Sequence, residues 1–548
     1  MDLISRFGVP TILHDVSRQC LVGAGAGFLS HTLYFIRGYH DTSILGIIVS
    51  HFAAYSTLIV SLGLPSATLI SASYILTLFT SIALYRLFFH PLRHFPGPVT
   101  AKLTKLYGPY LARNGQLHIE QNKHFAKYGS IVRIAPNELL ILSSTAIPTI
   151  HASKSGCRKR NAGVYNVVHY NGAHNLDSIL DREEHRWRRQ IWERAVTSKA
   201  LGVYENSTRE ICHTWLAKLA ALEGKPINTS LFSLLITFDH MGKIGFSHDF
   251  GTIEAGKENR MLDLLEVMFG QIGQLGELVW PVALMKSLGV GGDAAEFDEL
   301  TRQMADRRVE AHGEKEVDIF GHFIQDFRAE KPVAFFNKDI LLSDAGLILV
   351  GATDTIAVVL SYAFYHLAKH QEYQDRLFEE VTTVSGKTIP SEFTSGDLGK
   401  LELLEAIINE TMRLDNPVAN NAGRTTPPEG ITVDGVWIPG GVAVRVPGYA
   451  MHRSELAFVH PEEFIPERWT SKPGLILDRN AFFPFLSGPN NCVGKRVAMV
   501  VLRLVLSYTV LNYRFEFAPG EDGSAIHREA KDNLILKAGP LNVVFSKR

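Results

Sequence analysis

The stretch Phe485-Leu-Ser-Gly-Pro-Asn-Asn-Cys-Val-Gly494 decides the fold and the chemistry of this chain. One cysteine, Cys492, stands between two glycines and opens an apolar run with helical spacing. Gly488 and Gly494 permit backbone bends and a close approach that a side chain would block. The N–H groups at the start of the following helix would stabilise a thiolate. A thiolate held in this way is the axial ligand expected for a heme iron that cleaves O₂.

The same stretch resembles the heme-binding loop of the cytochrome P450 family, F-x-x-G-x-R-x-C-x-G. Phe485, Gly488, Cys492 and Gly494 match this pattern. Asn490 stands where the family usually has an arginine or histidine that reaches a heme propionate. The alternative for the cysteine alone is a small buried hydrophobe, a common environment for free cysteines. The resemblance implies that Cys492 is the metal ligand, binding the iron of heme b.

Composition bounds the class of protein. The 548 residues, 46% of them hydrophobic, suffice for one large domain plus an anchor. A net charge of −1 gives no indication of a nucleic-acid partner, and we expect a monomer. The scattered cysteines, without C-x-x-C spacing, argue against a disulfide framework or structural zinc and favour a reducing compartment. They are Cys20, Cys157, Cys212 and Cys492.

Residues 1–95 are predicted to form a membrane anchor. No Asp, Glu, Lys or Arg occurs from Thr42 to Tyr85, and a spanning helix needs about 20 apolar residues. The best candidates for spanning helices are 21–36, 43–63 and 67–86, with a turn near Pro65. One, two or three passes fit this pattern. The alternative, a buried hairpin of a soluble protein, conflicts with so long an uncharged run.

Positive charge follows the last apolar run. Arg86, Arg93 and His94 place the following domain on the cytosolic side of the membrane. Pro96-Gly-Pro98 resembles the proline-rich hinge that precedes the catalytic domain in the P450 family. We therefore expect a protein of the endoplasmic reticulum membrane with its catalytic domain in the cytosol.

Residues 96–548 are predicted to form one heme-thiolate catalytic domain, mainly α-helical with small β-sheets, as in the P450 fold. No low-complexity linker or internal repeat divides them. The longest predicted helix covers Asp339–His370. Short strands are expected near Ile131–Ile134, Ile431–Ile438 and Leu534–Phe545, which turn-forming residues bound.

A second motif, Val350-Gly-Ala-Thr-Asp-Thr-Ile356, lies in the middle of that long helix. A buried acid beside an alcohol is costly unless it is used, and the Thr355 hydroxyl can bond backward to a carbonyl and open the helix locally. The segment resembles the family's A/G-G-x-D/E-T-T/S pattern, with Ala352 and Ile356 as departures. The resemblance implies that Asp354 and Thr355 deliver protons during O₂ cleavage. The alternative is an ordinary polar pair in a helix.

A third motif is Glu410-Thr-Met-Arg413. Its i, i+3 spacing puts both charges on one helix face, but Glu183–Arg186 and Glu299–Arg302 share this spacing. Its context, after an apolar helix and before Pro466-Glu-Arg-Trp469, resembles the E-x-x-R and PERF segments of the family. The resemblance implies a buried structural triad of Glu410, Arg413 and Arg468.

A fourth motif is His185-Arg-Trp-Arg-Arg189. It resembles the family's W-x-x-x-R helix, with His185 at the aromatic position and Arg189 at the arginine. Arg424 is a further candidate for a heme propionate by resemblance. These three residues could compensate for Asn490. The alternative is a solvated basic helix face.

The resemblance, from the hinge to the C-terminus, implies a heme-thiolate monooxygenase of the EC 1.14 type. One atom of O₂ enters a C–H or C=C bond, by hydroxylation or epoxidation, and the other leaves as water. NADPH-derived electrons would come from a separate membrane-bound NADPH–cytochrome reductase, because the chain lacks a strand-borne G-x-G-x-x-G. We expect this reductase near Cys492, where positive charge gathers. The residues expected to supply it are Lys495, Arg496, Arg188 and Arg189.

The substrate is expected to be a lipophilic small molecule fed from the membrane. The anchor and the His185/Asn490 pattern resemble fungal members, which often act on terpenoids or other secondary metabolites. Met261–Leu288 resembles the mobile roof of the family's substrate channel, with plain helix core as the alternative. The family's substrate-contacting segments correspond here to about Val164–Leu180, Leu347–Gly351, Val418–Asn421 and Asn533–Leu536, with Asn420 and Asn421 as polar exceptions.

Three alternatives to a monooxygenase stay open at this point. A heme-thiolate isomerase or dehydratase would need no reductase, although such members often lack the acid–alcohol pair. A non-catalytic membrane heme-binding protein would bind heme without turnover. A membrane scaffold would bind no cofactor at all.

Overall fold

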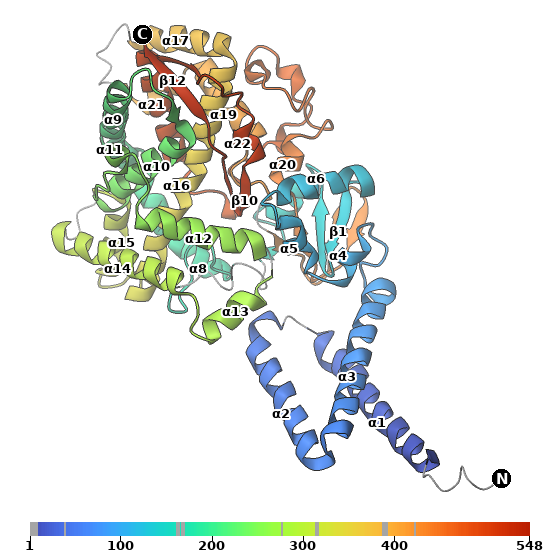
Figure 1. Cartoon of the computed structure of the whole chain (residues 1–548). Helices are drawn as coiled ribbons and strands as arrows, with labels where there is room; N and C mark the ends of the chain where they lie inside the picture. The colour runs from blue at the N-terminus through green and yellow to red at the C-terminus, as the bar shows by residue number, and fades with distance from the viewer. Residues whose placement is uncertain are drawn as a thin grey trace. The chain divides into compact units, whose positions relative to one another are not determined.

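The computed structural model describes residues 9–37, 40–159, 165, 170–275, 278–312, 317–385, 393–420 and 423–548. The chain divides into two compact units, which we call the anchor unit and the core unit (Figure 1). The anchor unit comprises Met1–Gly108, Val132–Glu138 and Glu277–Gly291. The core unit comprises Pro109–Ile131, Leu139–Gly276 and Gly292–Arg548.

Helices dominate the chain. In order, they are α1 (Val9–Ser30), α2 (Ile44–Leu62), α3 (Leu64–Leu84), α4 (Val99–Leu103), α5 (Tyr107–Ala112), α6 (Leu117–Tyr128), α7 (Ala146–His151), α8 (Arg182–Ala195), α9 (Ser198–Ala221), α10 (Thr229–Phe246), α11 (Thr252–Ala255), α12 (Arg260–Leu275), α13 (Trp280–Ser287), α14 (Gly292–His312), α15 (Ile319–Phe327), α16 (Lys338–Lys369), α17 (Gln371–Ser385), α18 (Ser395–Leu398), α19 (Glu402–Leu414), α20 (Gly448–His452), α21 (Lys495–Asn512) and α22 (Ala525–Arg528).

The strands are short. They are β1 (Ile131–Ala135), β2 (Glu138–Ile141), β3 (Arg158–Lys159), β4 (Ile227–Asn228), β5 (Arg424–Thr425), β6 (Ile431–Val433), β7 (Val436–Ile438), β8 (Ala443–Arg445), β9 (Tyr513–Phe517), β10 (Lys531–Asn533), β11 (Ile535–Lys537) and β12 (Asn542–Lys547). In the core unit, neighbouring strands run β2-β8-β5-β3 in one sheet and β4-β12-β9 in another, beside the hairpins β6-β7 and β10-β11.

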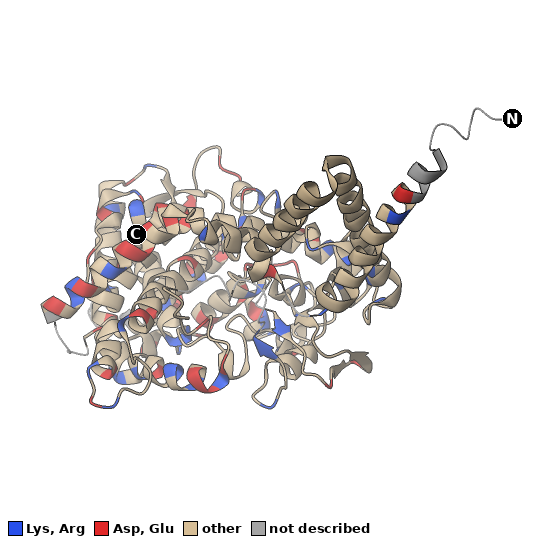
Figure 2. Ribbon diagram, turned by 90° about the horizontal axis from the view of Figure 1, so that it is seen from below, with Lys and Arg blue, Asp and Glu red and all other residues tan. Residues whose placement is uncertain are grey.

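The uncharged segment of the anchor unit forms a helical hairpin, α2 and α3 (Figure 2). By length and composition, Asp41–Leu62 and Leu64–Phe89 could each cross a membrane, as could Lys338–Lys369. In Lys338–Lys369, however, 67% of the apolar 18-residue window is buried. The chain reverses at Gly63, whose φ is +80°, two residues before Pro65 and within the region where we expected the turn. Glycine adopts this conformation freely, whereas proline fits the first turn of the next helix.

The remaining apolar segment of the anchor, α1, packs closely on α3. α1 ends at Ser30 and continues as a π-helix over His31–Phe35, so the helical segment begins earlier than the predicted 21–36. A Cβ at Gly23 would clash with the Ile70 carbonyl, and one at Gly27 with the Tyr74 carbonyl. Two glycines four residues apart let helix backbones approach in a membrane.

The segment after α3 is held by a buried arginine of the anchor unit. Arg133 of β1 is fully buried, and its guanidinium donates to the carbonyl oxygens of Pro136 (2.7 Å) and Arg86 (3.0 Å). Gly97 of the predicted hinge lies so close to Arg133 that a Cβ would clash with its carbonyl. Backbone hydrogen bonds and close packing therefore fix the hinge to β1.

The core unit is built around α16, close to the predicted helix Asp339–His370 (Figure 1). The Asn337 side chain caps its N-terminus by accepting a hydrogen bond from the Ile340 N–H at 2.9 Å. Most of the helix from Leu341 onward is buried, and it packs against α10, α14, α19 and α21. A helix that is apolar on nearly all sides is stable only inside such a core.

The predicted strand regions hold more strands than we expected. Ile431–Ile438 is a hairpin, because Asp434 and Gly435 both adopt positive φ and form the tight turn between β6 and β7. Leu534–Phe545 contains β11 and most of β12, which belong to different sheets. Alternation along the sequence indicated strands but not these divisions.

Candidate functional site

The cysteine loop is fixed by its own backbone. The Cys492 N–H donates to the Phe485 carbonyl at 2.9 Å, and Lys495 begins α21. Cys492 has protein atoms around it, yet its surface is exposed. Burial raises the pKa of its thiol, whereas the N–H groups of Gly494 and Lys495 and the charge of Arg189 lower it. These donors are the thiolate-stabilising groups that we expected at the helix start.

The two glycines of the loop differ in backbone conformation and in the space around the position of a Cβ. Gly488 has a φ of +74°, and a Cβ there would clash with the His151 carbonyl. Gly494 has an ordinary helical conformation, with φ of −79°, and a Cβ there would lie 3.7 Å from the Cys492 sulfur. Backbone geometry therefore requires glycine at 488 but not at 494, which corrects the common reason that we gave for both.

Arg189 joins α8 to the cysteine loop. Its Nη1 and Nη2 donate to the backbone oxygen and the Oδ1 of Asn491, each at 2.6 Å, and its Nε donates to Glu193 at 2.8 Å. This fork holds the residue next to Cys492, whereas Asn490 is half-buried in the preceding 3₁₀ turn, Gly488–Asn490. Arg189 therefore positions the loop, in addition to any contact with a propionate.

Basic side chains gather beside this loop. Lys159 of β3 and Arg424 of β5 are buried and lie directly opposite each other in an antiparallel pair. Like charges placed opposite each other in a sheet are destabilising unless an anion neutralises them. Burial lowers the pKa of Lys159 to about 8, and Arg424 contributes to this shift. Lys159 was not among the predicted site residues, because only the pairing of β3 with β5 brings it to Arg424.

Two histidines border the same basic cluster. Burial, together with the charges of Lys159, Arg189 and Arg424, lowers the pKa of His185 to about 3. Burial and Arg424 lower the pKa of His151 to about 3 as well, and the buried His151 Nδ1 has no hydrogen-bond partner among the described residues. Both imidazoles are therefore neutral at physiological pH and can hydrogen-bond an anion.

Arg188 does not belong to the docking surface that we predicted. Its guanidinium is buried and pairs with Asp344 of α16 at 3.2 Å and with Glu184 at 3.0 Å. Asp344 also accepts hydrogen bonds from the Trp192 indole and the Leu176 N–H. The helical spacing that placed Arg188 beside Arg189 turns its side chain inward, so it ties α8 to α16.

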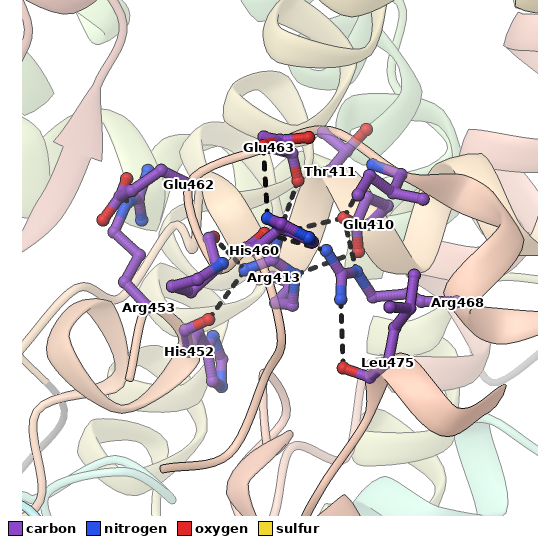
Figure 3. A network of polar contacts seen from close by, with 12 residues as sticks. Glu410, Thr411, Arg413, His452, Arg453, His460, Glu462, Glu463, Arg468 and Leu475 are labelled. Atoms are coloured by element: carbon purple, nitrogen blue, oxygen red, sulfur yellow. Dashed lines mark hydrogen bonds and ion pairs between the residues drawn. The ribbon is translucent and has the colours of Figure 1, made fainter. Parts of the chain in front are cut away.

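The structure brings Glu410, Arg413 and Arg468 together, as Figure 3 shows. Arg413 donates to both carboxylate oxygens at 2.9 Å, and the Arg468 Nε donates to Oε1 at 2.8 Å. The Trp469 indole and the Ile465 N–H also donate to this carboxylate. The remaining guanidinium donors reach backbone carbonyls, those of His452, Pro461 and Glu463 for Arg413 and those of Val459, His460 and Leu475 for Arg468.

Asp354 and Thr355 lie near the middle of α16. The Thr355 hydroxyl donates to the Gly351 carbonyl at 2.9 Å, but the helix is unbroken here, contrary to the local opening that we expected. Asp354 borders a cavity of about 270 Å³. Burial raises the pKa of its carboxyl to about 6, and Oδ2 is buried without a hydrogen-bond partner among the described residues.

The other predicted segments have varied positions. Most of 164–180 is described, except 164 and 166–169, and Asn421 also lies outside the described residues. Asn420 is buried and donates to Asp532 at 2.6 Å, so its amide nitrogen is already engaged. Met261–Leu288 contains α12 of the core unit and α13 of the anchor unit, where α13 packs on α2.

These features fit heme b. Cys492 offers sulfur at a helix N-terminus, and Lys159 and Arg424 place two buried cations opposite each other, a charge that suits anionic groups such as two propionates. Lys159 also donates to the carbonyl oxygens of Leu176 and Asp177. Arg189 and two neutral histidines complete the polar surroundings. Among the described residues, no cluster of His, Cys, Asp and Glu could hold a separate metal ion.

Comparisons with known proteins identify the family. The profile of the cytochrome P450 family matches residues 96–545. The cytochrome P450 monooxygenase FCK2 of Fusarium pseudograminearum (strain CS3096) is 32% identical over 538 residues, which cover 95% of this chain and 96% of that protein. The tryprostatin B 6-hydroxylase of Aspergillus fumigatus is 32% identical over 494 residues, 88% of this chain and 85% of that protein.

The fold agrees with a solved structure. The crystal structure of the cytochrome P450DA heme domain matches with a TM-score of 0.68 and 16% identity, over 83% of this chain and 98% of that one. The predicted fold class, mainly helical with small sheets, is confirmed. The family binds heme b and uses O₂ with electrons from a redox partner. Because the profile spans most of the sequence and full-length relatives align nearly end to end, this chain belongs to the cytochrome P450 family of heme-thiolate monooxygenases.

Proposed function

We propose that this protein hydroxylates or epoxidises a lipophilic small molecule of fungal secondary metabolism, such as a terpenoid. The names of its relatives support this class, since one of them is a tryprostatin B 6-hydroxylase. Apolar residues of α12, including Leu262, Leu265 and Phe269, favour a lipophilic substrate near the roof segment.

The observation that carries this proposal is the cysteine loop held by Arg189, together with the buried cations Lys159 and Arg424. Cys492 would bind the heme iron, with Phe485, Gly488, Asn490 and Gly494 forming its loop. The residues that would bind or orient the propionates are His185, Arg189, Arg424 and Lys159. The triad would hold the polypeptide on this side of the heme in a fixed shape.

Heme b, with O₂ and two electrons, supplies the oxygen-insertion chemistry when bound. The contribution of α16 would be proton management at two side chains. Asp354, with a pKa raised to about 6, can both hold and release a proton near neutral pH. The Thr355 hydroxyl, anchored on the Gly351 carbonyl, would orient that proton toward the oxygen side of the heme.

The anchor would hold this monooxygenase, as a monomer, in the endoplasmic reticulum membrane with the core unit in the cytosol. Helices α2 and α3 are long and apolar enough to span it, and the glycine-mediated packing of α1 on α3 supports a third membrane helix. NADPH–cytochrome reductase would deliver electrons at the exposed Lys495 and Arg496 near the cysteine loop. Exposed charges mainly accelerate and orient such transient encounters.

The first test is the carbon monoxide difference spectrum of the reduced full-length protein. We expect a thiolate-ligated band that is lost in Cys492→Ser and retained in Cys20→Ser, a control in α1. A band that survives in Cys492→Ser would reject the assigned ligand. Absence of any Soret absorbance in the wild type would favour a scaffold without cofactor.

The second test separates the remaining alternatives. With reductase and a ligand found by spectral shift, the wild type should consume NADPH and form an oxygenated product, and Asp354→Asn should lower that rate about 100-fold. Substrate conversion without NADPH consumption would favour an isomerase or dehydratase. Unchanged oxygen chemistry in Asp354→Asn would reject the proton role of this residue.

A further inference from the structure

A groove in the anchor unit lies where the crossing helices α1 and α3 separate (Figure 1). Gly23, Gly27 and His31 follow one face of the first helical segment, because they are spaced four residues apart. The two glycines let the backbones touch, and the large His31 side chain stands at the next position of this face. The groove has a volume of about 540 Å³, which is typical of small-molecule sites.

The groove wall is apolar at its rim and uncharged throughout. Its five apolar side chains are all exposed, so in a membrane they would contact lipid. They are Phe28, Ile36, Leu76, Leu84 and Phe89. The other groups in the wall are the His31 imidazole and the hydroxyls of Ser81, Tyr85 and three threonines, without a Lys, Arg, Asp or Glu from the part of the chain that the structure describes. Such a wall suits a neutral lipid, because a charged head group would be buried without a counter-charge.

His31 is the buried polar side chain of this groove, with 3% of its surface exposed. Its Nδ1 lies 2.7 Å from the Ser81 hydroxyl oxygen, and its ring meets that of Tyr85 edge-on at 5.6 Å between centroids. Within the described residues this is the only hydrogen bond of the ring, which leaves Nε2 for a ligand. A hydroxyl both donates and accepts, so it can pair with Nε2 in either tautomer, whereas an ester carbonyl can only accept.

The depth of the groove in the proposed membrane follows from the cations beside it. Arg37 and Arg86 come after the two helical segments, and such side chains extend to the head groups. His31 precedes Arg37 by six residues and Ser81 precedes Arg86 by five, which places both about 8 Å deeper along a helix. A sterol combines one neutral hydroxyl with a flat apolar ring system, and in a bilayer its hydroxyl faces the head groups. The position and chemistry of the groove match this class of lipid.

Two π-helical turns border the same groove. His31 begins the π-helix His31–Phe35, and Tyr85 begins the π-helix Tyr85–Phe89. Turns of this kind are rare and occur frequently at functional sites. Their occurrence on both walls of one groove is an indication of a binding site that does not depend on its side chains.

We propose that this groove binds a sterol of the surrounding membrane, with the sterol hydroxyl paired to Nε2 of His31 and the ring system against Phe28 and Leu76. The inference rests on the membrane anchoring in the proposed function and not on the heme chemistry. Bound in this way, the sterol fills the space between the separated ends of α1 and α3 and holds them together. It is a ligand of the anchor and not a substrate of the enzyme.

Photolabelling of the full-length protein in phosphatidylcholine vesicles tests the site. The probe is a sterol that keeps its hydroxyl and carries a diazirine in its ring system, and mass spectrometry identifies the labelled residues. We expect saturable labelling within 28–36 or 76–89 that the unlabelled sterol displaces. The same sterol without its hydroxyl should displace the probe about fivefold more weakly or worse, because it leaves the buried His31 nitrogen unpaired. This difference between the two competitors should disappear in His31→Ala.

Two matched pairs of variants locate the ligand. His31→Ala should weaken binding of the probe about fivefold or more, and His51→Ala should not change it. His51 is the control because it is a histidine of α2 whose Nε2 lies 2.9 Å from a hydroxyl of α3, that of Tyr74, outside the groove wall. Leu76→Trp fills the groove and should abolish saturable labelling. Ile75→Trp changes the exposed neighbour outside the wall and should retain it.

Several results would overturn the inference. They are labelling that unlabelled sterol does not displace, equal displacement by the two competitors in the wild type, and equal labelling of Leu76→Trp and Ile75→Trp. Displacement of the probe by a ligand that shifts the heme spectrum would make the groove a substrate site, and stronger labelling of the same residues by a phosphatidylcholine with a diazirine on its acyl chain would make it an acyl-chain site.

The carbon monoxide difference spectrum of the same samples separates this inference from the proposed function. A normal thiolate band without saturable labelling would reject the sterol site and leave the monooxygenase intact. Saturable labelling of the groove without a thiolate band would support the sterol site and reject the monooxygenase.

Discussion

Glu410 and Asp354 are two carboxylates of the core unit that are held in opposite ways. Five donors from Arg413, Arg468, Trp469 and Ile465 saturate Glu410, whereas Asp354 borders a cavity and has a buried oxygen that finds no partner among the residues that the structure describes. A saturated carboxylate has no capacity left for chemistry and holds its neighbours in place. A carboxylate with a free hydrogen-bonding position beside a cavity of about 270 Å³ is placed for proton transfer. The contrast separates the part of the site that must be rigid from the part that must react.

The largest effect should come from neutralising the saturated carboxylate. Glu410→Gln leaves two buried guanidiniums without their counter-charge, which should cost about 3–5 kcal/mol of unfolding free energy. Denaturant unfolding and heme content of the purified protein measure the loss. Glu467→Gln is the control, since its carboxylate pairs with the half-exposed Arg376, and it should cost about 1 kcal/mol or less. Equal costs in the two variants would contradict the contrast.

The next largest effect concerns the cysteine loop. Gly488→Ala places a Cβ against the His151 carbonyl at a positive φ, so we expect a cost of about 1–3 kcal/mol and a weaker thiolate band. Gly494→Ala has helical φ and only an ordinary contact with the sulfur, and it should keep the band. Carbon monoxide difference spectra distinguish the two, and a reversed order would show that the loop is shaped by position 494.

A smaller effect should appear as a pH dependence at Asp354. Burial raises its pKa to about 6 from 3.8, so the folded protein binds this proton more tightly than the unfolded chain. The stability that this proton contributes is full below about pH 4 and is lost as the pH rises to about 6. Relative to wild type, Asp354→Asn should therefore gain stability across this window and stay level above it. Unfolding free energies measured from pH 4 to 7 test this, and parallel curves would argue that Asp354 is not buried as described.

The smallest effect on stability should come from Thr355→Val. The hydroxyl bonds to a carbonyl of its own helix, and such back-bonding contributes little to stability. We expect a change of about 0.5 kcal/mol or less, together with a clear loss of product per NADPH consumed. Thr382→Val, which removes a similar back-bond to Phe378 on the exposed side of α17, should leave both quantities unchanged. A stability loss above that of Glu410→Gln would assign Thr355 to the structural group.

Much of the fold followed from local patterns. The apolar runs located α2 and α3 to within a few residues, and the length and apolar character of α16 indicated a buried central helix. An error lies where individual backbone angles decide, as at Asp434–Gly435. Such angles are set by individual turns, which hydrophobic periodicity does not report.

The sequence identified candidate site residues only where they belong to a motif with a fixed spacing between its residues. Cys492 and the Asp354–Thr355 pair stand in such motifs, but Lys159 does not, because its role comes from the register of β3 against β5. The prediction that Arg188 belongs to the docking surface was wrong because it, too, depends on a contact between distant segments. Its burial depends on the approach of Asp344 from a helix about 150 residues away in sequence.

The three E-x-x-R segments show most clearly which features the sequence determines and which the tertiary structure determines. The sequence by itself determined that each glutamate would face its arginine, because i, i+3 spacing does so on any helix. The Glu183–Arg186 and Glu299–Arg302 pairs form and lie in solvent, whereas Glu410 and Arg413 are fully buried. Only the tertiary structure decided this, by bringing Arg468 and a set of backbone carbonyls to the third pair. Burial removes the water that would otherwise bond to the charged groups, so a buried ion pair is stable only when each of its donors and acceptors has a protein partner. For Glu410 and Arg413, those partners come from segments distant in the chain.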